Sequence, residues 1–376
     1  MTPLINLVRQ LVAINSINPA MNSGPGEAEV AQWATSWLRA RGIDCKLQEA
    51  APGRPNVIAR VVGRGEAPAL LLNAHLDTVA VEGMDTPFIL RVEGDRLYGR
   101  GAYDMKGSAA IMLSLAEHFV ASPPPGDIWL TLVSDEEDFS IGSDAIVRDW
   151  LPTLQSQPTA ALVLEPTEEG IGIAHKGFGW YEMEVRGRAA HGSLPDEGLD
   201  AIAPLGAVLG TLLALEKQFA AGPTHPLLGR PSLHASVISG GSGWSVYPAE
   251  AQLRWERRTL PSESQSDLQA EMERVLAAAR TVNGADVTGH CAFARDPLGT
   301  SSEAPLVSAL QRAVPEAPLV GLPFWTDGAL FSAAGLSTVI YGPMGHGAHA
   351  IDEWVSLSSL ERVREAVRQV IEAGAF

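Results

Sequence analysis

Apolar segments of strand length alternate with a segment of helical period through the first part of the chain, and this alternation restricts the possible folds more than any other feature. The strand-like segments lie at residues 56–62, 69–77, 127–135 and 161–166, and the helix-period segment lies at 107–119. Such apolar strands are typical of sheets that helices cover on both faces. The pattern therefore predicts an α/β layer around a mainly parallel sheet.

The pattern changes in the middle of the chain. From Phe178 to about Ala292 the order becomes strand, long helix, two strands, helix and strand. Two strand–helix–strand halves in one stretch are typical of a small α+β domain of the ferredoxin-like type. Because 376 residues exceed one ordinary core, we predict a domain of residues 177–293 inserted into a larger one made of 1–176 and 294–376.

Composition and charge limit the class of protein. Apolar residues make up 46% and charged residues 19%, a globular composition. The net charge of -17 offers no basic footprint for nucleic acid or an anionic membrane surface, so we expect neither as a partner. Cys45 and Cys291 do not make a disulfide framework, and the first twenty residues lack the features of a secretory signal, which favours the cytoplasm.

Four consecutive acidic residues follow one of the predicted strands, directly after Ser134. They are Asp135, Glu136, Glu137 and Asp138. Like charges this close together require a cation or solvent to offset them. In an extended segment, the side chains of Glu136 and Glu137 point to opposite sides. We therefore expect these two glutamates to have different roles.

Further side chains able to bind a metal lie at predicted strand ends and in glycine-rich loops. They are His75 and Asp77 in NAHLDTV, Asp104 in GRGAYDMKG, Glu165 in LVLEPT, and His346 and His349 in GPMGHGAHAIDEW. Strand ends of open α/β sheets border the crevice where ligands bind. Imidazoles and carboxylates without thiolates favour Zn²⁺, with Co²⁺ or Mn²⁺ as substitutes. So many oxygens predict two ions about 3.5 to 4 Å apart, bridged by one carboxylate.

These motifs, in this order, resemble those of the di-zinc aminoacylase and carboxypeptidase family. That family includes acetylornithine deacetylase, succinyl-diaminopimelate desuccinylase and bacterial glutamate carboxypeptidase, and the resemblance extends over nearly the whole chain. The ligand sets that it implies are His75, Asp104 and Glu165 for one zinc, and Asp104, Glu137 and His349 for the other, with Asp104 as the bridge. The residues alone leave His346 open as a ligand, whereas the family's register favours His349.

The same resemblance implies roles for residues that do not bind metal. Asp77 would orient the imidazole of His75, and Glu136 would be the general base. The inserted domain would be a lid through which two chains form a homodimer, and His191 would donate to the oxyanion in the neighbouring subunit. By itself, His191 is also compatible with a loop histidine that caps the next helix.

Substrate contacts are implied at four positions. Arg258 resembles the arginine that binds the substrate's α-carboxylate, a task that suits the planar guanidinium. Ser245 stands where relatives often have Asn, and Trp325 stands where many have Gly, directly before Thr326. We expect these residues to line the substrate site, with Trp325 narrowing the acyl pocket.

Arg258 has two alternatives. It can be an ordinary strand charge that pairs with Glu256, and Arg257 is a second candidate for the carboxylate contact. Neither is decided by the sequence.

The resemblance implies a zinc-dependent amidohydrolase that cleaves the amide of an N-acyl amino acid with a free carboxylate, as acetylornithine deacetylase does, by attack of a metal-bridging water. A metallo-carboxypeptidase or dipeptidase acting on a short peptide is the alternative. A non-catalytic relative that binds amino acid derivatives is a third possibility. Glu136 favours catalysis, because we expect a non-catalytic relative to lose its general base first.

Overall fold

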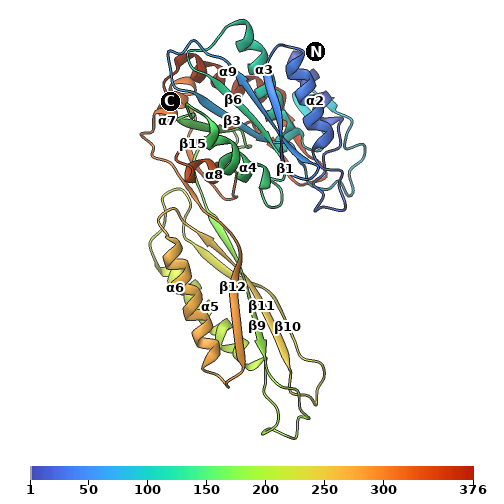
Figure 1. Ribbon diagram of the computed structural model, residues 1–376, viewed down its shortest axis with the longest axis vertical. Helices are drawn as coiled ribbons and strands as arrows, with labels where there is room; N and C mark the ends of the chain where they lie inside the picture. Colours follow the sequence, from blue (N-terminus) through green and yellow to red (C-terminus); the bar gives the residue numbers. More distant parts are fainter. Residues whose placement is uncertain (1) are drawn as a thin grey trace. The chain divides into compact units, whose positions relative to one another are not determined.

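A computed structural model describes residues 2–376, apart from the side chain of Gln265. The chain forms two compact units (Figure 1). The large unit contains the chain up to Ile173, Gly299–Val320 and Thr326–Phe376, and the small unit contains Ala174–Leu298 and Gly321–Trp325. The domain boundaries expected from the sequence stay a prediction, and the sequence gives no sign that 321–325 joins the small unit.

A nine-stranded sheet, counted over the described residues, forms the centre of the large unit. Its order is β1 (Asp44–Ala51), β2 (Arg54–Val61), β6 (Ile128–Val133), β3 (Leu70–His75), β7 (Ala160–Val163), β15 (Ser337–Ile340), β8 (Ile171–His175) and β13 (Leu298–Gly299), with β14 (Leu319–Leu322) paired to β8. The central strands β6, β3, β7 and β15 run parallel, and antiparallel pairs flank them. The predicted mainly parallel α/β fold is confirmed.

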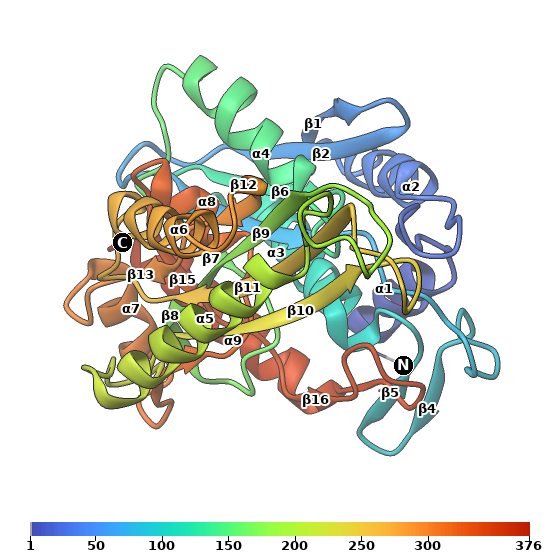
Figure 2. The ribbon, with the colours of Figure 1, turned by 90° about the horizontal axis from the view of Figure 1, so that it is seen from below.

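Helices cover both faces of this sheet (Figure 2). They are α1 (Pro3–Val12), α2 (Ala28–Arg39), α3 (Gly107–Ala121), α7 (Pro305–Ala313) and α9 (Leu357–Ala373) on one face, and α4 (Ile141–Ala145) and α8 (Gly328–Ala333) on the other, with short turns η1 (Ala102–Lys106), η2 (Ile146–Trp150) and η3 (Leu151–Thr153). Leu70 and Leu72 of β3 share one core with Leu113 of α3 and Val367 of α9. Leu71, between them, points to the opposite face, which explains the unbroken apolar run.

A second, small sheet of the large unit was not indicated by the sequence. It contains β4 (Arg91–Glu93), β5 (Arg96–Tyr98), β16 (Gly345–His346) and β17 (Trp354–Ser356) in antiparallel pairs. Strands of two or three residues are too short to show a period in the sequence. The sheet matters because β16 and β17 form a hairpin whose loop, residues 347–353, contains His349.

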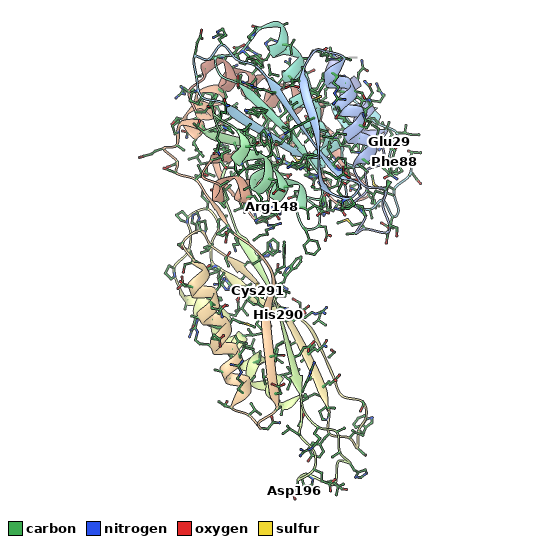
Figure 3. All side chains as sticks on the ribbon, in the orientation of Figure 1. Glu29, Phe88, Arg148, Asp196, His290 and Cys291 are labelled. Carbon is green, nitrogen blue, oxygen red and sulfur yellow. The ribbon has the colours of Figure 1, made fainter. Side chains whose placement is uncertain are left out.

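The small unit is a four-stranded antiparallel sheet with two helices. Its strands are β9 (Gly177–Arg186), β10 (Ser232–Gly240), β11 (Glu250–Thr259) and β12 (Asp286–Arg295), in the order β10-β11-β9-β12, and its helices are α5 (Ala203–Ala221) and α6 (Gln265–Arg280). Both helices pack on one face, where Met183 and Leu253 meet Val208 and Leu276. Figure 3 labels His290 and Cys291 along β12. The order confirms the predicted ferredoxin-like α+β domain.

The long helix of the small unit begins later than the sequence suggested. The apolar period predicts a start at Leu199, whereas α5 begins at Ala203. Oδ1 of Asp200 accepts hydrogen bonds from the N–H groups of Ile202, at 2.7 Å, and Ala203, at 3.2 Å, and Pro204 occupies the first turn. An acceptor before a helix and a proline inside its first turn together fix where it starts.

Within residues 2–376, no helix combines the length and the apolar character that crossing a bilayer requires.

Burial in the central sheet predicts a stability effect. Ile58 of β2 is 2% exposed and Ile89 is 66% exposed, both in the large unit. Ile58→Ala should lower the free energy of unfolding by about 2 to 5 kcal/mol, because it removes buried methyl groups and leaves a cavity. Ile89→Ala, which deletes the same atoms, should change it by less than about 0.5 kcal/mol. Urea titration followed by circular dichroism measures both, and equal effects would contradict the burial.

Candidate metal centre

The carboxyl ends of three adjacent parallel strands bring four of the predicted residues together. β3 ends at His75, the segment after β6 contains Glu136 and Glu137, and Glu165 follows β7 by two residues. β3 lies between β6 and β7, with His75 directly opposite Val133. Side chains that follow such strands gather at one edge of the sheet. The strand order therefore explains why residues far apart in sequence meet.

Asp104 stands between two histidines. It lies in η1, just before α3, and its Oδ1 is 3.0 Å from Nε2 of His75. Its Oδ2 is 3.4 Å from Nε2 of His349, and that nitrogen is 2.9 Å from Oε2 of Glu137. One oxygen of Asp104 thus faces each imidazole, which is the arrangement that a bridging carboxylate requires.

His346 lies apart from this cluster. It is exposed, and its Nε2 is 3.7 Å from Oδ2 of Asp352. Its ring centre is 6.4 Å from that of Trp354. Of the two histidines that the sequence left open, the structure places His349 against Asp104.

Two groups of side chains are arranged so that each can surround a cation. The ligand atoms of His75, Asp104 and Glu137 lie within 4.8 Å of one another, and so do those of His75, Glu136 and Glu165. Nε2 of His75 is 3.8 Å from Oε1 of Glu165. Glu136 and Glu137 fall into different groups, so neighbours in sequence take separate positions in the cluster.

The acidic run forms a turn over residues 136–139, so the expectation of an extended segment was wrong. The N–H of Ser140 donates to the carbonyl of Asp135 at 2.6 Å and closes this turn. A turn separates the carboxylates in direction more effectively than a strand. Asp135 itself is neutralised inside the protein, because its Oδ1 accepts from Arg54 at 2.7 Å and from Asn18 at 3.0 Å.

Asp77 supports both the imidazole and the turn. Its buried carboxylate accepts from the N–H groups of Glu136 and Glu137, each at 3.1 Å, and from the amide of Asn18 at 2.8 Å. Its Oδ1 lies 3.6 Å from Nδ1 of His75, whereas its carbonyl oxygen lies 3.0 Å from the same nitrogen. The orientation of His75 thus depends on the main chain of Asp77 as well as on its carboxylate.

The cluster holds more buried negative charge than the chain neutralises. Burial raises the pKa of Glu136, Glu137 and Glu165, and nearby carboxylates add to the rise, to about 7 for Glu137. Hydrogen bonds with Asp104 and Glu137 raise the pKa of His349 to about 10. No described residue donates a hydrogen bond to the buried Oε1 of Glu137. Divalent cations would relieve this charge, so the residues present fit a metal centre.

Glu353 is a residue that the motif search missed. Its buried carboxylate accepts from Nη1 of Arg100 at 2.7 Å and from the N–H groups of Gly101, Tyr103 and Asp104 at 2.9, 2.9 and 3.1 Å. Glu353 ends the loop between β16 and β17, which contains His349. Its carboxylate therefore connects the loop of His349 to the segment of Asp104. The only sequence signal was an acid close behind the late histidine, in AHAIDE.

Four of the residues expected outside the metal cluster, His191, Ser245, Arg258 and Trp325, belong to the small unit. His191 is exposed, with Nδ1 2.7 Å from Oγ of Ser193. Ser245 is also exposed. Nη2 of Arg258 lies 2.6 Å from Oε1 of Glu256, so the alternative strand pairing does form.

The remaining candidates differ in exposure. Arg257 is 1% exposed and its Nε lies 3.2 Å from Oε1 of Glu271, on the helix side of the sheet. This burial disfavours Arg257 as the carboxylate contact. Trp325 donates from Nε1 to the carbonyl of Asp296 at 3.0 Å. Thr326 is fully buried and presents no surface to a ligand.

Comparison with known proteins identifies the family. Residues 71–373 match the model of peptidase family M20/M25/M40. An acetylornithine deacetylase of Photorhabdus laumondii is 29% identical over 73% of this chain and 72% of its own, and a succinyl-diaminopimelate desuccinylase of Dinoroseobacter shibae is 24% identical over 99% of each. The crystal structure of an aminopeptidase from Bacillus cereus has a TM-score of 0.79 at 18% identity, covering 99% of this chain and 98% of that one.

The chain therefore belongs to peptidase family M20/M25/M40, and the resemblance inferred from its motifs is confirmed. Membership makes it a metal-dependent hydrolase that acts on amide bonds.

The contacts of Glu353 predict an effect on metal affinity. Glu353→Gln replaces an acceptor of four hydrogen bonds by an amide, which should loosen the main chain at Asp104. We expect affinity for Zn²⁺ to fall by about 10- to 100-fold, as is typical when a residue that supports a ligand is changed. Competition with a chromogenic chelator measures this affinity without any need for turnover.

Glu271→Gln is the matched control, because Glu271 is also a buried carboxylate that pairs with an arginine, and it lies in the small unit. It should lower stability and leave Zn²⁺ affinity unchanged. Equal affinities of Glu353→Gln and the unchanged protein would exclude the role assigned to Glu353.

Proposed function

We propose that this chain is a zinc-dependent amidohydrolase that cleaves the amide of an N-acyl amino acid with a free carboxylate. The observation that carries the proposal is the position of Asp104 between His75 and His349, with Glu136 and Glu137 close by. The relatives named acetylornithine deacetylase and succinyl-diaminopimelate desuccinylase support a deacylase.

Two cations would be held by ligands that share one carboxylate. The proposed sets are His75, Asp104 and Glu165 for one ion, and Asp104, Glu137 and His349 for the other. Nitrogen and oxygen donors without sulfur suit Zn²⁺, with Co²⁺ or Mn²⁺ as substitutes. When bound, the pair would polarise the amide carbonyl and lower the pKa of the attacking water.

Glu136 is the proposed general base. Burial first, and then the charge of Glu165, raises the pKa of its carboxyl group above the ordinary value for glutamate. Its carboxylate takes a proton from the attacking water and passes it to the nitrogen of the leaving amine. The bond from its N–H to Oδ1 of Asp77, 3.1 Å long, holds the main chain of this base in place.

The small unit supplies the proposed substrate contacts. Arg258 binds the α-carboxylate, Ser245 and Trp325 line the site, and His191 donates to the oxyanion in the neighbouring subunit. For Thr326 we propose a structural role instead, because it is fully buried and its hydroxyl accepts from the N–H of Gly328 at 3.2 Å.

A homodimer through residues 177–293 is also proposed. Exposed apolar side chains of the small unit support it: Val237 and Ile238 are 51% and 55% exposed on β10, an edge strand, and Trp244 is fully exposed. Large exposed apolar side chains on one domain favour association. A cytoplasmic location agrees with the two free cysteines, Cys45 and Cys291.

The proposed roles predict that Glu136→Gln separates metal binding from turnover. The variant should keep its zinc content and lose turnover of N-acetyl amino acids by about 10²- to 10⁴-fold, because the base is gone while the ligands remain. Elemental analysis and a ninhydrin assay of the released amine measure the two quantities. The control is Glu29→Gln, at an exposed position in α2 (Figure 3), which should change neither. Full activity of Glu136→Gln would exclude the base assignment.

A peptidase is the second candidate, because a dipeptide is itself an amino acid acylated on nitrogen. N-acetyl amino acids, dipeptides and glutamate-terminated peptides separate the two when their kcat/KM values are compared on the zinc-loaded enzyme. We expect at least about tenfold higher values for the N-acyl amino acids, the size of effect that one contact difference produces. Faster cleavage of dipeptides would replace the deacylase by a peptidase.

A further inference from the structure

One face of the small unit's sheet is opposite to its helices. Along β9, Tyr181, Met183 and Val185 belong to the core beneath α5 and α6. Phe178 and Trp180 alternate with them and therefore point to the other face.

The strand register places an arginine on each side of Phe178. Phe178 of β9 pairs with Arg258 of β11 on one side and with Arg295 of β12 on the other. Directly opposed residues point to the same face of a sheet. The guanidinium carbon of Arg258 lies 5.3 Å from the ring centre of Phe178, within the range of a cation–π contact.

A second row continues the aromatic surface. Trp180 is opposite Phe293 of β12, and their ring centres are 5.6 Å apart. Phe178 lies 5.1 Å from Trp180 and 5.9 Å from Phe293. Arg295 lies 4.8 Å above the ring of Phe293.

Trp325, from the segment 321–325 of the small unit, contacts the same aromatic cluster. Its ring is 6.1 Å from that of Phe178 at an interplanar angle of 89°, and Arg295 lies 5.6 Å above it. Its Nε1–H donates a hydrogen bond to the carbonyl of Asp296, with a nitrogen–oxygen distance of 3.0 Å, and this bond holds the indole in place. We call Phe178, Trp180, Phe293 and Trp325, with Arg258 and Arg295, the aromatic face.

A β-bulge creates this surface. The register between β12 and β9 shifts between Cys291 and Phe293, so that Ala292 is an extra residue. Without it, Phe293 would point to the helix side, because a one-residue slip reverses every side chain of a strand. A bulge that turns a phenylalanine away from the core and toward the surface lowers burial, which favours a binding role over a purely structural one.

Cross-strand aromatic pairs also stabilise sheets that bind nothing. Two features go beyond that role. Trp180 is 40% exposed, although packing alone would favour its burial. Each guanidinium also has five N–H donors, so Arg258 can pair with Glu256 and still bind a carboxylate.

We propose that the aromatic face binds the aromatic acyl group of an N-aroyl amino acid, of which an N-benzoyl amino acid is the simplest example. The ring of the ligand stacks on Trp180 and Phe293, and its carboxylate is attracted by the two arginines. This inference rests on the proposed function for the N-acyl amino acid class, and the aromatic acyl group is what it adds.

Calorimetric titration of the full-length, zinc-loaded Glu136→Gln protein tests the inference, because that variant binds without turnover. An N-benzoyl amino acid and the N-acetyl derivative of the same amino acid are the two probes. We expect a Kd at least about tenfold lower for the N-benzoyl compound, from stacking and added apolar contact. Equal values, or binding of neither probe, would overturn the proposal.

Trp180→Leu in the same background removes the indole and keeps apolar bulk. It should raise the Kd of the N-benzoyl compound by at least about fivefold and leave that of the N-acetyl compound unchanged. Ile89→Ala, at a 66% exposed position of the large unit with no proposed contact to substrate or to a second chain, is the control and should change neither. A loss that is equal for both probes would mean that Trp180 is only structural, and would overturn the proposal.

The unmodified enzyme separates this inference from the proposed function. If it hydrolyses both compounds with equal kcat/KM and the variant binds both equally, the aromatic face fails while the deacylase stands. If the N-benzoyl compound binds selectively but neither compound is hydrolysed, the deacylase fails while the aromatic face stands.

Discussion

The concentration of buried carboxylates at one edge of the central sheet is the constraint on which the large unit depends. The chain neutralises some of them itself: Asp135 through Arg54, Asp77 through two main-chain N–H groups and Asn18, and Glu353 through Arg100 and three main-chain N–H groups. Asp104, Glu136, Glu137 and Glu165 have two imidazoles near them and no lysine or arginine partner among the described ion pairs. Cations from solution are the remaining way to stabilise them, so this cluster fits a metal centre better than a network of ion pairs.

This distribution also separates ligands from their supports. A carboxylate that accepts several N–H bonds holds the main chain, as Asp77 does for the turn after β6 and Glu353 does for the segment before Asp104. A carboxylate that faces an imidazole keeps oxygens available for metal. The carboxylates proposed as metal ligands are therefore placed precisely only when the supporting carboxylates hold the main chain beside them.

The sequence predicted the parts of this site that follow from local pattern. Apolar runs that end in His75 and Glu165 mark buried strands, and parallel strands bring their ends together whatever lies between them. It did not predict Glu353, because a contact with Arg100 across about 250 residues leaves no period or spacing to read. It also mistook the turn at Glu136 for an extended segment, since no glycine or proline marks that turn.

The small unit also has a feature that sequence patterns could not predict. Its strands and helices could be predicted, and Trp325 could be recognised as unusual, but the surface to which Trp325 contributes depends on a single extra residue in β12. Ala292 carries no turn signal, yet it decides whether Phe293 and Arg295 lie beside Trp180 and Phe178 or among the side chains beneath the helices. Register is set by packing along the whole pair of strands. A change of ligand preference can therefore arise from one inserted residue, without the substitution of any aromatic residue.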